Sequence, residues 1–108
     1  MIRCPCEGVV TITVSVNAEG AGDGPLGEES ARIAFDENAT AAGKALRDRA
    51  HFLADQVQCD EPCQKGRIYV GPPYIEPNEP IPEPATPHGR RVLTGNVSVR
   101  VVVPCRKG

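Results

Sequence analysis

Two stretches of the chain alternate between apolar and polar positions, which is the pattern of a half-buried β-strand. Valine occupies every second position of residues 97–103, and residues 10–16 alternate valine or isoleucine with threonine or serine. Such β-branched side chains favour the pleated surface of a sheet. The antiparallel register that matches all the apolar positions pairs Val10 with Val101, Ile12 with Val99, Val14 with Val97, and Cys6 with Cys105.

The segment between these strands has a helical period from residue 38 to residue 58. Asp36 or Asn38 is able to cap its N-terminus. Its apolar stripe consists of Ala42, Leu46, Ala50, Leu53 and Val57. At 1.5 Å per residue this helix is about 30 Å long and matches a nine-residue strand, so we expect one helix to cover the sheet. Residues 31–36 fit either a short strand hairpinned to the first strand or a helical lead-in.

Two connections and one short strand lie outside this pattern. Residues 18–30 are rich in glycine and lack the Gly-Lys-Ser/Thr ending of a phosphate loop, so we expect a flexible surface loop. Residues 67–70 predict a short strand at a sheet edge, open to pairing with another molecule. Residues 72–91 form a proline-rich loop, which we expect to be extended and excluded from a sheet interior. Its candidate partner-binding residues, at the spacing of a minimal polyproline ligand, are Pro77, Pro80, Pro84 and Pro87.

Together these elements predict a single α+β domain over residues 1–108. We expect a two-layer β-α-β-β sandwich, with one helix packed on a three-stranded sheet and the C-terminal strand central, as the right-handed crossover rule favours. The start of the first strand, the end of the helix and the end of the last strand then meet at one pole. All the cysteines lie at these places: Cys4, Cys6, Cys59, Cys63 and Cys105. If residues 31–36 were a strand, Cys59, Cys63 and Cys105 would lie at the opposite pole from Cys4 and Cys6.

A cysteine cluster of this kind has several possible uses. Disulfides that join Cys4 or Cys6 to Cys59, Cys63 or Cys105 would stabilise a small domain. Four thiolates would bind zinc, although the spacings of the two cysteine pairs are not those of common zinc motifs. Buried free thiols would act as small apolar side chains. A redox pair of Cys59 and Cys63 is the least favoured use, because the two acidic residues between them disfavour thiolates.

Composition and charge exclude some classes of partner. A formal net charge of −2 argues against a nucleic-acid-binding surface. The outward face of the two long strands carries only Thr11, Thr13, Ser15, Ser98 and Arg100, together with Val9 and Val102, and offers no aromatic platform for bases. No apolar run approaches the roughly 18 residues of a membrane span.

We therefore predict a non-catalytic binding or assembly domain, stabilised by disulfides at one pole and without a cofactor, whose partner is another protein or a second copy. The alternative is a small zinc-binding protein that uses cysteine thiolates, and the third hypothesis is a thiol redox protein. Residues 1–8 do not resemble a signal peptide. Five cysteines in 108 residues nevertheless favour a secreted or periplasmic compartment, if a leader has been removed.

Overall fold

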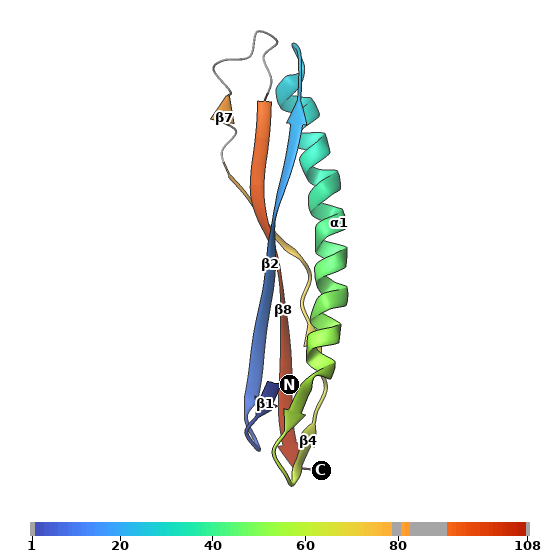
Figure 1. The fold of residues 1–108 in the computed structure, drawn as a ribbon, viewed down its shortest axis with the longest axis vertical. Coiled ribbons are helices and arrows are strands. Elements are labelled where there is room, and N and C mark those ends of the chain that lie inside the picture. The colour runs from blue at the N-terminus through green and yellow to red at the C-terminus, as the bar shows by residue number, and fades with distance from the viewer. Residues whose placement is uncertain (1, 79–80, 83–90, 108) are drawn as a thin grey trace.

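The protein is a long α+β rod with principal extents of 65 × 18 × 17 Å (Figure 1). The structure, a computed structural model, describes residues 2–78, 81–82 and 91–107. The elements in these residues are β1 (Ile2–Cys4), β2 (Val9–Gly22), α1 (Gly27–Asp55), β3 (Val57–Cys59), β4 (Cys63–Lys65), β5 (Tyr69–Val70), β6 (Tyr74–Pro77), β7 (Ile81–Pro82) and β8 (Arg91–Lys107). The predicted combination of one helix and a mostly antiparallel sheet is confirmed for this part of the chain.

The two long strands, β2 and β8, pair antiparallel along the whole length of β2. The register places Val10 opposite Val103 and Val14 opposite Val99, two residues away from the predicted alignment. Because side chains alternate with a period of two, a two-residue shift leaves each side chain on its predicted face. The expected juxtaposition of Cys6 and Cys105 is wrong, because β2 begins only at Val9.

The strand β8 is central, as predicted, but the sheet has more than three strands. Four short strands, β4 to β7, pair in turn with the side of β8 opposite β2, so the described sheet contains six strands. Two of them, β6 and β7, lie within the segment predicted as a proline-rich loop. Proline is tolerated at a sheet edge, where its missing N–H costs no ladder hydrogen bond. The prolines therefore place this segment at an edge and do not remove it from the sheet.

The helix α1 begins at Gly27, well before the predicted start near Asn38. Residues 31–36 are therefore helical, which keeps all the cysteines at one pole. Neither Asp36 nor Asn38 is the N-cap; Leu26 occupies that position without a side-chain cap, and the Asn38 Nδ2 donates to the Glu19 carbonyl at 2.6 Å. At its other end α1 is closed by Lys65, whose Nζ lies 3.3–3.4 Å from the carbonyls of Ala54 and Asp55.

The core is formed where α1 lies on β8. Val97, Val99, Val101 and Val103 are at most 1% exposed. The helix presents a stripe of mainly small residues to β2 and β8: Gly27, Ala31, Phe35, Ala39, Gly43, Leu46, Ala50 and Ala54. Small residues on α1 and on β2 let the backbones of these two elements approach closely. The glycines predicted as a loop serve this purpose, and only residues 23–26 connect β2 to α1.

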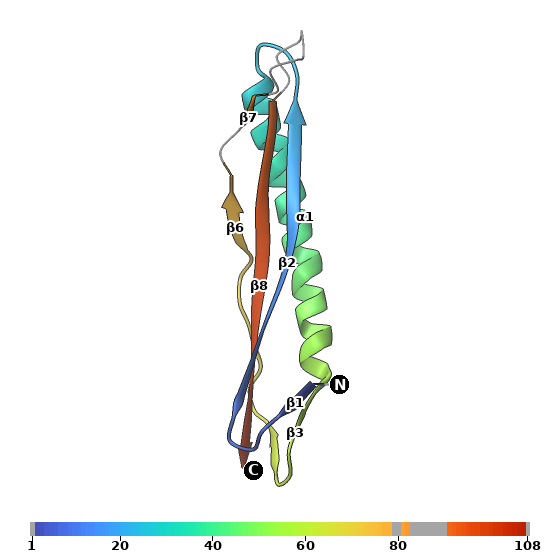
Figure 2. The same cartoon turned by 60° about the vertical axis from the view of Figure 1, so that its left-hand side comes forward.

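One face of the long sheet is covered by α1, and the other face is open. Figures 1 and 2 together show that the C-terminal half of β2 runs beside the helix, whereas its N-terminal half lies apart from it. At the lower end of the rod, β1 and β3 form a separate two-stranded parallel sheet.

Candidate functional site

The cysteine pole, defined as the end of the rod that holds all five cysteines, is built by four short backbone pairings. Parallel pairing of β1 with β3 places Cys4 beside Cys59. Pairing of β4 with the end of β8 brings Cys63 and Lys65 next to the last residues of β8. The Asp60 amide donates to the Cys4 carbonyl at 2.9 Å, and the Cys105 amide donates to the Gly8 carbonyl at 2.9 Å. The predicted gathering of the cysteines is therefore observed.

Four of these cysteines form disulfides, Cys6–Cys63 and Cys59–Cys105. Their Cα–Cα distances, 5.2 and 5.7 Å, lie in the normal range for such bonds. Cys6–Cys63 is among the predicted pairs, whereas Cys59–Cys105 is not. Cys59 and Cys63 do not bond to each other, so the pair considered for redox chemistry is divided between two disulfides.

Cys4 is a free and fully buried thiol, which realises the third use considered for the cysteines. Its Sγ lies within 4.8 Å of the sulfurs of Cys59 and Cys105 and donates weakly to the Pro5 carbonyl at 3.6 Å. Three sulfur atoms thus meet in one place. In the oxidised state two of them are bonded to each other, so this group is able to bind a metal only after the Cys59–Cys105 disulfide is reduced.

The open face of the sheet carries two aromatic side chains that sequence reasoning missed. Tyr69 lies opposite Val102 and Tyr74 lies opposite Ser98, so both belong to the outward-facing set of side chains. They are 57% and 63% exposed. The two long strands themselves carry no aromatic residue, as predicted, but the short strands β5 and β6 add two aromatic rings to this face of the sheet. β5 and β6, which place the tyrosines there, are only two and four residues long, too short for a periodic pattern.

These tyrosines line a groove of about 340 Å³, which we call the tyrosine groove. Its lining residues are Thr13, Tyr69, Gly71, Pro72, Tyr74, Ser98 and Arg100. The Gly71 amide donates to the Arg100 carbonyl at 2.8 Å, which holds the segment between the tyrosines against β8. The groove therefore combines two phenol rings, one cation and two aliphatic hydroxyl groups on a backbone fixed by sheet hydrogen bonds.

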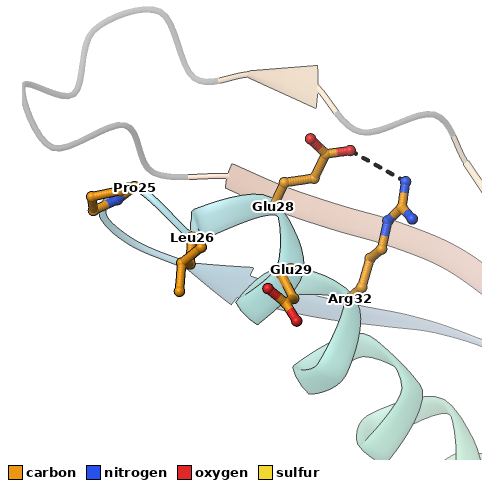
Figure 3. A pocket seen from close by; sticks show the side chains of 5 residues that line it. All are labelled: Pro25, Leu26, Glu28, Glu29 and Arg32. Carbon is orange, nitrogen blue, oxygen red and sulfur yellow. Dashed lines mark hydrogen bonds and ion pairs between the residues drawn. The ribbon is translucent and has the colours of Figure 1, made fainter.

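A second hollow lies at the N-terminus of α1 and is lined by Pro25, Leu26, Glu28, Glu29 and Arg32 (Figure 3). Arg32 donates to the Glu28 carboxylate at 3.2 Å, so these two charges offset each other. The third charged residue of the lining, Glu29, gives the hollow a net negative charge. Carboxylates in the first helical turn already interact favourably with the helix dipole. This hollow therefore does not suit an anionic ligand.

The candidate partner-binding prolines are only partly placed. Pro77 is exposed at the end of β6, opposite Gly95. Pro80, Pro84 and Pro87 lie outside the described residues. Their role as a docking peptide stays a prediction.

Comparison with protein families, characterised proteins and solved structures finds no match for this chain. Disulfides are more typical of extracellular or periplasmic proteins than of cytosolic ones. Within the described ranges, no helix combines the length and the apolarity needed to cross a lipid bilayer.

Proposed function

We propose that this chain is a non-catalytic binding domain, stabilised by disulfides, whose tyrosine groove holds an extended segment of a protein partner. The observation that carries the proposal is the grouping of exposed Tyr69 and Tyr74 around Arg100 on the open face of the sheet. Aromatic rings that remain exposed on a rigid surface are common at protein interfaces, because they provide contact area at a low entropic cost.

The groove has the chemistry that an extended, proline-containing segment requires. Flat aromatic walls bind the rings of a polyproline II helix, which is already extended and loses little entropy on binding. The Arg100 guanidinium fits an acidic side chain in that segment, since it forms two parallel hydrogen bonds with a carboxylate. The hydroxyls of Thr13 and Ser98 complement backbone groups of the same segment.

Intrinsic fluorescence gives a direct test, because the chain has two tyrosines and no tryptophan. Both fluorophores line the groove. We expect a synthetic peptide of alternating Pro-Pro and Glu residues to change the tyrosine emission saturably. A peptide in which lysine replaces each glutamate should bind at least about tenfold more weakly, because it loses a charge-assisted hydrogen bond to Arg100.

Two alanine variants of exposed aromatic residues provide the matched comparison, with calorimetry as the readout. Tyr74→Ala should weaken peptide binding by about tenfold or more, as expected for an interface tyrosine. Phe52→Ala removes a ring on α1 that is 60% exposed and should leave binding unchanged. A flat fluorescence titration, or equal binding by wild type and Tyr74→Ala, would contradict the proposal.

A second candidate function is zinc binding by the reduced protein. The observation that favours it is the group formed by Cys4, Cys59 and Cys105, whose sulfurs lie within 4.8 Å of one another. Three thiolates provide most of a tetrahedral zinc site, and zinc prefers thiolate ligands. Because binding needs the Cys59 and Cys105 thiolates, it would compete directly with the disulfide.

Cobalt provides the test, since Co²⁺ substitutes for zinc and gives thiolate charge-transfer absorption. We expect the reduced protein to bind one Co²⁺ with these bands. Cys4→Ser should lose them, whereas Cys6→Ser should keep them because Cys6 is not in the group. Absence of the bands in the reduced wild type, or equal spectra for the two variants, would rule this candidate out.

A further inference from the structure

The strand β2 presents a free edge to solvent. Among the described residues it pairs with β8 and with no other strand. In an antiparallel strand every second residue directs both its N–H and its C=O to the same side, so half of these groups point away from β8. Residues 9–17 of this edge contain no charge and no proline, the two devices that most often prevent an edge from pairing.

The opposite edge of the same sheet is guarded. It is divided into four strands, β4 to β7, each two to four residues long. Proline occurs between and within them, at Pro72, Pro73 and Pro77. Short strands and prolines are established means of blocking edge-to-edge association. The contrast indicates that the sheet is closed to partners on one side and open on the other.

The N-terminal half of β2, which forms this free edge, is also incompletely buried. Val9 is 59% exposed and Val16 is 43% exposed, and Val10, Ile12 and Val14 are only partly buried. The other half of β2 is covered by α1, which also binds the Glu19 carbonyl through Asn38. Partly exposed apolar side chains and outward-pointing backbone groups thus coincide between Val9 and Val16.

The side-chain sequence of this edge is symmetric. Residues 10–16 read Val-Thr-Ile-Thr-Val-Ser-Val, and the same alternation of β-branched apolar and hydroxyl residues appears in reverse around Thr13. A strand with this symmetry is complementary to a second copy of itself related by a two-fold axis, the geometry of most homodimers. We infer that two copies of this chain pair antiparallel through β2, with the axis at Thr13.

This pairing extends the sheet of one protomer into that of its partner. It places Val10 opposite the partner's Val16, Ile12 opposite the partner's Val14, and Thr11 opposite the partner's Ser15. The partly exposed apolar side chains then cover one another, and the hydroxyl side chains form cross-strand pairs on the open face. Thr13 also lines the tyrosine groove, so the two grooves would lie on the same face.

Charged residues at positions 11 and 15 test both the edge and the register. Both side chains are exposed and lie directly opposite Val102 and Ser98 within the protomer, and Arg100, opposite Thr13, is the diagonal neighbour of both. We expect wild type to sediment at twice its 11.5 kDa mass. Thr11→Lys combined with Ser15→Lys opposes like charges at two symmetric places and should raise the dimer dissociation constant about tenfold or more. Thr11→Lys combined with Ser15→Glu should restore the dimer.

The outcomes separate this inference from the proposed binding function. A wild type that remains monomeric up to about 1 mM, a double-lysine variant that remains dimeric, or a Lys/Glu variant that does not recover would each overturn it. Circular dichroism and disulfide mapping confirm the fold of each variant. Tyrosine fluorescence of the same samples measures peptide binding, so a monomer that binds the peptide refutes the dimer and leaves the groove intact.

Discussion

At the residue scale, glycines in β2 explain how the helix approaches the sheet. A Cβ on Gly20 would meet the backbone of Ala31 and Phe35, with the Ala31 carbonyl oxygen 2.6 Å away. A Cβ on Gly95 of β8 would lie 2.7 Å from the Phe35 ring. Sequence reasoning assigns Gly20 to a loop, because glycine is common in turns. Here both glycines are required by packing, and that role depends on a neighbour far along the chain.

We predict that Gly20→Ala lowers the free energy of unfolding by about 1–3 kcal/mol, as overpacking of a tight site does. The atoms that the new methyl group would meet belong to the backbone, which cannot move aside as a flexible side chain can. Urea unfolding followed by circular dichroism measures the effect. Ala21→Val, at the adjacent exposed position of β2, should stay within about 0.5 kcal/mol of wild type. Equal stabilities for the two variants would show that α1 does not pack closely here.

At the element scale, the parts of the fold that were predicted are those with a long periodic pattern. Strands β2 and β8, the C-terminal two-thirds of α1 and the central position of β8 follow from alternation and topology. The start of α1 was missed because Leu26 is not a capping residue, although acidic Glu28 and Glu29 in the first turn are a usable signal. Strands β4 to β7 are too short to show any period, and the tyrosine groove was missed with them.

The clustering of the cysteines was also predictable at this scale, whereas their connectivity was not. Topology determines which ends of elements meet, but five cysteines at one pole allow many pairings. The register of β1 with β3 and of β4 with β8 selects among these pairings. Each of the two pairings involves only three residues of each strand, too few to show a pattern in the sequence.

We predict that each disulfide stabilises the pole by about 2–5 kcal/mol, because the two bonds close loops with sequence separations of 57 and 46 residues. Replacing both cysteines of one disulfide by alanine removes the cross-link without leaving a free thiol. Urea midpoints of the Cys6→Ala/Cys63→Ala and Cys59→Ala/Cys105→Ala variants should both fall, and reduction of wild type should lower the midpoint further. An unchanged midpoint in either double variant would contradict a stabilising role for that disulfide.

At the scale of the whole molecule, the unusual property is elongation. The Cα radius of gyration is 19.2 Å, compared with about 13 Å for a compact domain of 100 residues. A rod of this kind has a long sheet for its mass, with one open face and one unguarded edge along the same strand pair. The tyrosine groove and the β2 edge are neighbours for this reason, and both depend on strands whose full length the sequence pattern did not reveal.

The first and last described residues, Ile2 and Lys107, lie towards the same end of this rod, and the Glu7–Lys107 ion pair at 3.8 Å lies there too (Figures 1 and 2). The chain is therefore suited to circular permutation. A short linker would join the old ends beside the disulfides, and new ends would open in the connection at residues 23–26, at the far tip. Cargo attached to such a permuted chain would be displayed the length of the rod away from cargo attached to the natural one.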